Sequence, residues 1–212
     1  MELRPDGSLL VQTPLSMSRL SAEDVASDTA EIARLVELTI GGDSAAFEQI
    51  VRRYEARVMT LALRIVGARD EARDATQEIF LRAFKYLHRL DVHKPVERWL
   101  IGITVNVCRD AVRRRQRQRE TFVHEERPEA IDESPDPYAD LEQKQQRRML
   151  QAALDSLPEK ERLAVLLRDV EGFSTSEVAS MLGSSETTVR SQVSRGRVRL
   201  KLAIERLLRG GR

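Results

Sequence analysis

The sequence is poor in the residues that most metal sites and disulfide frameworks require. Cys108 is the only cysteine in 212 residues, so no disulfide can form within the chain, as is usual for a protein of the reducing cytoplasm. A single cysteine is also too few for a cysteine-rich zinc site. The histidines His88, His93 and His124 are not spaced as HExxH. We therefore expect no metal and no cofactor.

Catalytic and membrane signals are equally scarce. The sequence shows no serine, histidine and aspartate set and no glycine-rich loop that would hold a phosphate, so we do not expect an enzyme. No apolar run approaches the roughly 20 residues of a membrane-spanning helix. The N-terminus has no basic stretch followed by an apolar one, as a signal peptide would. We expect a cytoplasmic protein.

The formal net charge is only +1, which alone argues against a nucleic-acid-binding protein. The charge is, however, distributed very unevenly. Residues 109–119 carry a net charge of +5 and residues 186–212 carry +6, whereas residues 120–142 carry −8. Two basic segments separated by an acidic one suggest contact with two separate stretches of DNA.

Apolar residues recur at steps of three and four, and no strand-like alternation stands out. The pattern predicts an all-α protein with two helical domains joined by an acidic, flexible linker. We expect a flexible leader at 1–27, a four-helix domain at 28–118, the linker at 119–140 and a second helical domain at 141–212. Pro128, Pro135 and Pro137 would interrupt any helix in the linker.

The first domain contains recognisable helix ends. Asp28 is a candidate N-cap with Glu31 three residues later, and Asp43 is a candidate N-cap for the next helix. Gly67 should end that second helix. The third helix is expected at 69–90 and the fourth from Pro95 onward.

The inward faces of these four helices follow from the spacing. In chain order, the predicted inward residues are Ile32, Leu35, Val36 and Ile40; Phe47, Ile50, Val51, Tyr54, Val58, Leu61 and Ile65; Ala72, Ala75, Ile79, Ala83 and Leu87; and Val96, Trp99, Leu100, Ile103, Val107 and Ala111.

The fourth helix ends in a dense basic run. Its members are Arg109, Arg113, Arg114, Arg115, Arg117 and Arg119, against Asp110 alone. Cations are favourable at a helix C-terminus, but this density exceeds what that effect needs. We expect contact with a phosphate backbone.

The most specific local pattern in the second domain lies between Ser174 and Leu202. Ser174 and Glu177 form a capping box for a short helix, Gly183 permits the positive φ of a tight turn, and Val189 anchors a longer helix. This spacing indicates a helix-turn-helix, whose second helix enters the major groove. The residues predicted to point outward from that helix toward DNA are Thr187, Arg190, Ser191, Ser194, Arg195 and Arg197.

The remaining helices of the second domain are predicted from the same spacing. One helix should reach Leu157, and Pro158 should start the next. The predicted inward residues are Leu163, Leu166, Leu167 and Val170, then Val178, Met181 and Leu182, and finally Val189, Val193, Gly196, Leu200 and Leu207.

The chain resembles the extracytoplasmic-function (ECF) sigma factors of the sigma-70 family from about residue 32 to residue 208. The stretches that carry the resemblance are GDSAAFEQIVRRYEARV, DEARDATQEIFLRAFKYL, VERWLIGITVNVCRDAVRRR and LPEKERLAVLLRDVEGFSTSEVASMLGSSETTVRSQVSRGRVRLK. The resemblance implies that the first domain is sigma region 2 and the second is sigma region 4. It further implies a factor that joins core RNA polymerase and directs promoter-specific initiation.

The resemblance assigns roles to particular residues. Asp74, Gln77, Glu78 and Phe80 match the motif that docks on the clamp helices of the largest polymerase subunit, although Arg73 stands where the family usually has an acidic residue. Trp99 matches a core tryptophan of region 2. Within the span 85–106, which captures unpaired bases of the minus-ten element, Asn106 matches a frequent asparagine, and Arg113 and Arg114 would hold phosphates.

The same resemblance extends to region 4 and to partners. The final helix would read the minus-thirty-five element, with Arg190, Ser191, Ser194 and Arg195 as its base-facing residues. The acidic linker resembles the segment that threads the RNA exit path. The implied partners are core polymerase, promoter DNA and an anti-sigma factor, which in this family is often membrane-bound.

One alternative is a helix-turn-helix transcriptional regulator without sigma activity. The DNA-reading helix is compatible with it, but the DATQEIF motif and the four-helix domain are left unexplained. Stable binding to core polymerase would separate the two functions.

Overall fold

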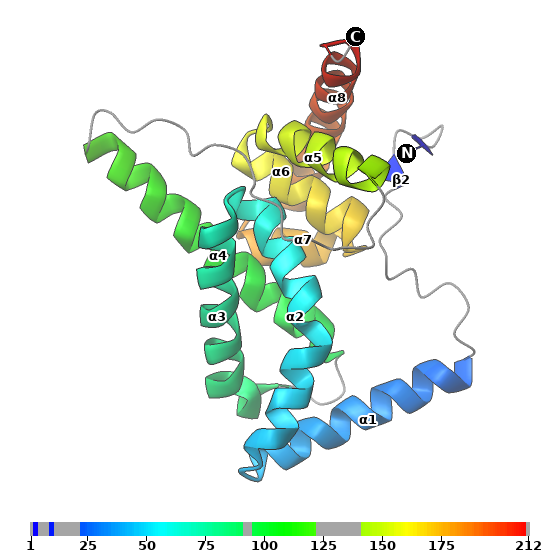
Figure 1. Ribbon diagram of the computed structural model, residues 1–212, viewed down its shortest axis with the longest axis vertical. Helices are drawn as coiled ribbons and strands as arrows, with labels where there is room; N and C mark the ends of the chain where they lie inside the picture. Colours follow the sequence, from blue (N-terminus) through cyan, green and yellow to red (C-terminus); the bar gives the residue numbers. More distant parts are fainter. Residues whose placement is uncertain (1, 4–8, 11–21, 91–94, 122–140, 211–212) are drawn as a thin grey trace. The chain divides into compact units, whose positions relative to one another are not determined.

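The computed structural model describes residues 2–3, 9–10, 22–90, 95–121 and 141–210 (Figure 1). The chain forms two compact units, one of residues 17–129 and one of residues 130–212 together with residues 1–16. The predicted all-α fold with two helical domains is confirmed. Two-residue strands, β1 (Glu2–Leu3) and β2 (Leu9–Leu10), pair in antiparallel fashion within the segment expected to be a flexible leader.

The first unit contains four α-helices and one short 3-10 helix among its described residues. They are α1 (Ala22–Ile40), α2 (Ser44–Val66), α3 (Arg69–Tyr86), η1 (Leu87–Arg89) and α4 (Val96–Thr121). Helices α2, α3 and α4 pack against one another as a three-helix bundle, and α1 packs on one end of α2 (Figure 1). The bundle therefore leaves one side of α3 and one side of α4 to face outward.

The local signals at the ends of α2 behave as predicted. The Asp43 carboxylate accepts hydrogen bonds from the backbone N–H groups of Ala45 and Ala46, at 2.9 and 3.2 Å. Gly67 adopts a left-handed conformation with φ of 80° and donates its N–H to the Leu63 carbonyl. Both ends of this central helix are thus fixed by short-range chemistry.

The start of the first helix differs from the prediction. Helix α1 begins at Ala22, so Asp28 and Glu31 lie inside it and do not cap it. Both acids instead face α2, where the Arg53 guanidinium pairs with Asp28 and lies 3.7 Å from Glu31. The carboxylates that resembled a capping box therefore join two helices.

The core of the first unit largely follows the predicted stripes. The inward residues of α3 are all buried, whereas Ile40, at the last residue of α1, is exposed. The buried stripe of α4 is wider than predicted, because Ile101, Thr104, Val105, Cys108 and Val112 are also buried. Burial raises the pKa of the Cys108 thiol to about 12. One face of α4 is therefore buried along most of its length.

The second unit is built from five helical segments among its described residues. They are α5 (Leu141–Asp155), α6 (Glu159–Val165), the π-helical turn η2 (Leu166–Val170), α7 (Thr175–Leu182) and α8 (Glu186–Gly210). Helix α8 packs on α5, α6 and α7. The predicted single helix from residue 158 is thus an α-helix that widens into a π-helical turn, which Gly172 follows with φ of 70°.

The turn between α7 and α8 forms as predicted. The Ser174 hydroxyl and the Glu177 carboxylate make the reciprocal bonds of a capping box, and Gly183 has φ of 60°. The Ser185 hydroxyl accepts a hydrogen bond from the N–H of Thr188 at 3.1 Å. Val189 is fully buried, whereas Leu207 near the end of α8 is exposed.

Two predicted segments fall partly outside the described residues. Of the expected linker at 119–140, residues 119–121 form the last turn of α4, which is a correction, and residues 122–140 are not described. His93 and Lys94, which precede the fourth helix predicted from Pro95 onward, are not described either. Among the described helices, none combines the length and the apolarity needed to cross a membrane.

Candidate polymerase and nucleic-acid interfaces

The outward side of α3 presents the residues predicted to dock on polymerase. Asp74 and Gln77 are exposed. The Glu78 carboxylate accepts a hydrogen bond from Arg82 Nε at 2.6 Å, one helical turn later. Phe80 is only 8% exposed, so it contributes to the packing beneath that surface. The four residues therefore form two layers, with polar groups outside and an aromatic ring below.

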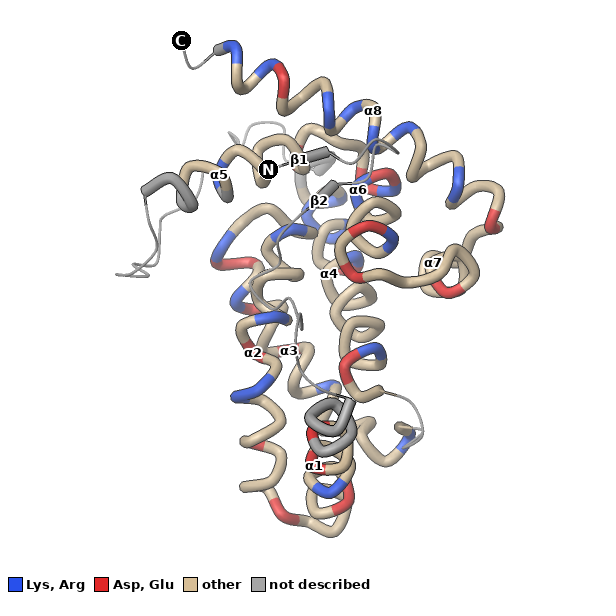
Figure 2. The backbone as a smooth tube through the Cα atoms, turned by 90° about the vertical axis from the view of Figure 1, so that its right-hand side faces the viewer, with Lys and Arg blue, Asp and Glu red and all other residues tan. Residues whose placement is uncertain are grey.

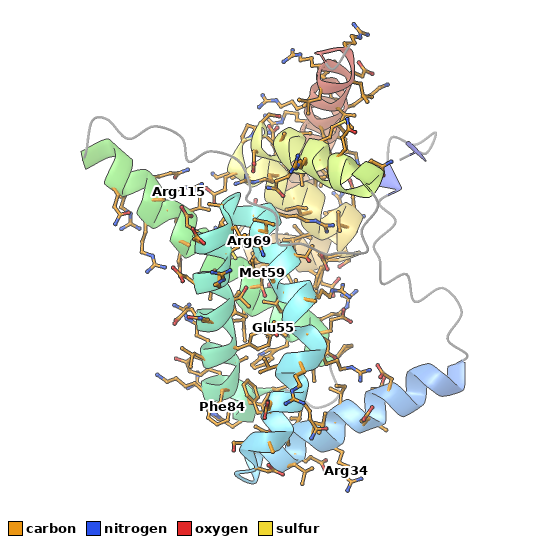
Figure 3. All side chains as sticks on the ribbon, viewed as in Figure 1. Arg34, Glu55, Met59, Arg69, Phe84 and Arg115 are labelled. Atoms are coloured by element: carbon orange, nitrogen blue, oxygen red, sulfur yellow. The ribbon has the colours of Figure 1, made fainter. Side chains whose placement is uncertain are left out.

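An open apolar groove continues this surface toward the end of α3. It is lined by Phe47, Gln77, Phe80, Leu81 and Phe84. Leu81 is 66% exposed, and the rings of Phe47 and Phe84 meet edge to face with centroids 4.9 Å apart. Figure 3 shows Phe84 on α3, close to α2. Sequence reasoning missed the groove, because Leu81 and Phe84 fall off the predicted inward stripe.

The end of α3 carries an aromatic ring flanked by cations. Lys85 Nζ lies 5.5 Å and the Arg89 guanidinium carbon 5.0 Å from the centroid of the Tyr86 ring. Such contacts are cation–π interactions. They lie immediately before residues 91–94, which the structure does not describe. The predicted base-capturing span thus begins with a basic, aromatic surface.

The outward side of α4 holds Asn106, Arg113 and Arg114, all of which are exposed. Within the described residues, no hydrogen bond or ion pair engages Arg113 or Arg114. Arg115 differs from them, because its guanidinium bonds the Glu71 carboxylate at 3.2 Å and the Val66 carbonyl at 3.0 Å. Figure 3 shows Arg115 on α4 facing the bundle. The basic run therefore contains at least one structural arginine.

Trp99 lies at the other end of α4. It packs, partly buried, against a cluster formed by residues of α1, α2, η1 and α4, which includes Ile32, Val36 and Leu90. The structural role predicted for Trp99 is confirmed by this packing.

Lysine and arginine residues recur along the length of α8 (Figure 2). The small polar residues Thr187, Ser191 and Ser194 are exposed, and they lie opposite the buried Val189 and Val193. Arg190 and Arg195 flank this polar stripe, as the 100° advance per residue of a helix requires. The arrangement suits a major groove, since arginine and hydroxyl side chains donate to base edges and phosphates.

Two arginines of α8 form hydrogen bonds with carboxylates. Arg190 bonds Glu186, one turn earlier, at 2.6 Å. Arg197 makes a two-point contact with Asp169 of η2, at 2.9 Å from Nε and 2.6 Å from the second terminal nitrogen. The Asp169 side chain is only 4% exposed, and that of Arg197 is 30% exposed. Arg197, predicted as a DNA contact, therefore also fastens α8 to η2.

A second buried carboxylate faces the other side of α8. The Glu161 side chain of α6 is 8% exposed and lies 3.9 Å from Arg195 Nε and 3.5 Å from Arg199 Nε. The sequence analysis singled out neither Glu161 nor Asp169. The sequence feature that could have pointed to them is a charged residue within a largely apolar stripe.

Family models match both units. Residues 50–118 match Sigma-70 region 2, and residues 147–200 match Sigma-70, region 4. The first match covers α3 and most of α4, and the second covers the helix-turn-helix and the first fifteen residues of α8.

Several curated relatives span both regions. The chain is 40% identical over 165 residues to ECF RNA polymerase sigma factor SigE of Mycolicibacterium smegmatis, a match that covers 76% of this chain and 63% of that protein. It is 34% identical to ECF RNA polymerase sigma factor SigM of Mycobacterium tuberculosis, covering 79% of this chain and 82% of that protein. It is 30% identical to ECF RNA polymerase sigma-E factor of Escherichia coli K12, covering 82% of this chain and 95% of that protein.

Solved structures show the same fold. The sigma factor RpoE of Bartonella quintana, in complex with the anti-sigma factor NepR, aligns with a TM-score of 0.61 at 24% identity, covering 75% of this chain and 96% of that one. CnrH, in complex with the cytosolic domain of CnrY, aligns with a TM-score of 0.57 at 22% identity, covering 82% of this chain and 97% of that one.

Proposed function

The chain belongs to the ECF sigma factors of the sigma-70 family, and we propose that its two helical units divide promoter-specific initiation between them. Members of this family are transcription initiation factors and not enzymes. In this proposal the first unit captures core RNA polymerase and opens the minus-ten element, and the second reads the minus-thirty-five element. A regulator without sigma activity would not account for the match of residues 50–118 to Sigma-70 region 2.

The polymerase-binding surface of this proposal is the outward side of α3. Asp74, Gln77 and Glu78 supply polar contacts, and Phe80 supports them from below. The adjoining groove adds Leu81 and the ring of Phe84, and large exposed apolar side chains are typical of a protein interface. An apolar centre with a polar rim is the anatomy that a stable complex with polymerase requires.

The minus-ten role rests on the outward side of α4 and the end of α3. Arg113 and Arg114 are exposed and form no ion pair among the described residues, so their charges suit the phosphates of an opening duplex. Asn106 can donate to and accept from an unpaired base edge. The ring of Tyr86 beside Lys85 and Arg89 offers a stacking surface of the kind that binds single strands.

The observation that carries the proposal is the outer face of α8. A helix-turn-helix with a complete capping box presents Thr187, Ser191 and Ser194 between two flanks of arginine. Arg195 and Arg190 are the residues expected to read base edges, because arginine can bind guanine through two hydrogen bonds. Arg197 contributes to the same surface while it pairs with Asp169.

The proposed setting follows from the family. The protein would act in the cytoplasm, where polymerase and promoters are found. Because a solved neighbour forms a complex with an anti-sigma factor, we propose that this chain also binds an anti-sigma partner, which keeps it inactive until a signal releases it. The acidic segment between the units would follow the path of the RNA exit channel, where its charge keeps it away from DNA.

The function is tested by run-off transcription. The purified protein and bacterial core polymerase are incubated with a pool of genomic promoter fragments, with core polymerase alone as the control. Specific transcripts that depend on the protein establish the sigma function and reveal both promoter elements. An absence of such transcripts, together with no binding to core polymerase, would favour a plain helix-turn-helix regulator.

A further inference from the structure

Glu161 occupies an unusual position behind the DNA-reading helix. Its side chain is almost fully buried, yet among the described residues its Oε2 accepts no hydrogen bond. A buried carboxylate normally needs a partner charge or several hydrogen bonds to offset its lost hydration. The charges within reach are the guanidinium groups of Arg195 and Arg199 on α8.

The close crossing of α6 and α8 creates this arrangement. A Cβ atom at Gly196 would lie only 2.7 Å from Val165 Cγ2 and 3.1 Å from the Glu161 carbonyl oxygen. Only glycine therefore permits this approach. Because Arg195 precedes Gly196 and Arg199 follows it by three residues, both side chains emerge beside the crossing point, where they meet the Glu161 carboxylate.

The contacts engage only part of each guanidinium group. Arg195 approaches Glu161 through Nε at 3.9 Å, and the same Nε lies 3.4 Å from the Ser191 carbonyl. Arg199 also approaches through Nε, at 3.5 Å. Within the described part of the chain, no hydrogen bond engages the terminal nitrogens of Arg195, so their donors remain for a base edge or a phosphate, and the side chain is 61% exposed.

We propose that Glu161 is a positioning residue for base reading, which orients Arg195 from behind without using its terminal donors. The inference rests on the proposed minus-thirty-five function of α8. An arginine held in one orientation loses less side-chain entropy when it binds guanine, so its contact discriminates more strongly between bases. The negative charge of Glu161 also lowers the attraction of this flank for any phosphate.

Loss of Glu161 should raise the affinity for unrelated DNA and lower the preference for the correct base. These opposite changes make the positioning role testable. Without the charge, Arg195 and Arg199 are free to bind phosphates, so affinity for unrelated DNA rises. Without the orientation, the preference for the correct base falls. A residue that only stabilises the fold would instead lower both affinities together, along with the melting temperature.

The test compares Glu161→Gln with Glu159→Gln in the complete holoenzyme. Glu159 lies on the same helix, forms no hydrogen bond or ion pair with α8 among the described residues, and undergoes the same change of charge. The probes are the strongest promoter found by run-off transcription and the same fragment with a scrambled minus-thirty-five element, each bound at several salt concentrations. The melting temperature of each free variant is measured in parallel.

For Glu161→Gln we expect the ratio of the two affinities to fall about fivefold to tenfold, since one base contact is weakened. The slope of log affinity against log salt should become more negative by about 1. Glu159→Gln should change neither quantity, and both variants should melt close to the wild type.

Two other outcomes overturn the inference in different ways. If the wild-type holoenzyme does not distinguish the intact from the scrambled element, the minus-thirty-five role of α8 fails and the inference fails with it. If the wild type discriminates and Glu161→Gln keeps the same ratio, or loses both affinities in parallel with its melting temperature, only the positioning role of Glu161 fails.

Discussion

The two basic surfaces of this protein are built in different ways. On α8, Arg190, Arg195 and Arg197 each have a carboxylate partner, and the partners of the last two are buried. On α4, Arg113 and Arg114 are engaged by no side chain within the described residues. The net charges of the two segments in the sequence are nevertheless similar.

The two arrangements suit different kinds of contact with DNA. Reading a base edge requires a donor in a fixed orientation, so an arginine anchored from behind loses less freedom on binding. Holding a phosphate backbone requires charge, and a free arginine can follow the backbone as the duplex opens. We therefore expect α8 to supply sequence discrimination and α4 to supply affinity.

The largest effect should come from disrupting the binding of core polymerase, because both DNA-binding surfaces act only within the holoenzyme. Asp74→Arg reverses a charge on the proposed polymerase-binding side of α3, and like charges placed across an interface cost several kcal/mol. We expect binding to core polymerase to fall roughly a hundredfold, on the order of 3 kcal/mol, and all promoter-specific transcription to fall with it. Affinity measurement with labelled core polymerase gives the result.

The matched control is Glu55→Arg, because Glu55 is exposed on α2 (Figure 3) and undergoes the same reversal of charge. It should bind core polymerase as the wild type does. Normal binding by Asp74→Arg would show that α3 is not the docking surface.

The next largest effect should separate the recognition of promoter bases from the binding of core polymerase. Arg195→Ala removes one base contact worth roughly 1–3 kcal/mol, so promoter-specific transcription should fall about tenfold or more. Binding to core polymerase should remain normal. Arg206→Ala, an exposed arginine eleven residues further along α8, is the control and should have a much smaller effect. Equal losses of transcription and core binding would contradict the assigned role of Arg195.

A smaller and more uniform effect is expected on α4. The double substitution of Arg113 and Arg114 by alanine should weaken DNA binding by a similar factor on every promoter, and the salt slope should become less negative by about 2. Titrations of two unrelated promoters at several salt concentrations give both quantities. A loss confined to one promoter sequence would mean that these arginines read bases, and the proposed contrast with α8 would be wrong.

The smallest effect concerns the pH dependence of stability that arises from the buried face of α4. The pKa of the Cys108 thiol is raised from its ordinary value of 9.0 to about 12, because burial disfavours the thiolate. Since the folded state holds this proton more tightly than the unfolded state, stability should decline as pH rises from about 9 toward 12. Cys108→Ala should reduce this decline, as measured by urea unfolding at several pH values. An identical decline in both proteins would assign it to other groups.

Sequence reasoning succeeded where the determining interactions are short in range. The cap at Asp43, the left-handed Gly67 and the capping box of Ser174 with Glu177 all involve residues within four positions of one another. The apolar stripes also follow from helical spacing alone. These features together position the side of α3 that we propose for docking and the side of α8 that we propose for base reading.

The predictions were wrong or incomplete where contact with a second helix determines the environment of a side chain. Asp28 does not cap α1 because the helix begins six residues earlier, at Ala22, and the Asp28 carboxylate instead pairs with Arg53 on α2. Glu161 is buried where α8 crosses α6 at Gly196, and Asp169 is buried where Arg197 of α8 pairs with it. The sequence around them shows only a charged residue within an apolar stripe, which does not identify the contact with α8. The positions missed by the sequence are thus contacts between segments distant in the chain.

The most direct test of this division of labour is transcription from a promoter library with a randomised minus-thirty-five element. Holoenzymes that carry the wild type, Arg195→Ala and the double alanine variant at Arg113 and Arg114 are compared by sequencing their transcripts. We predict that Arg195→Ala flattens the base preference of at least one position, whereas the double variant lowers total output and leaves the preferences unchanged. Flattened base preferences in the double variant, or unchanged base preferences in Arg195→Ala, would contradict the proposed roles of α4 and α8.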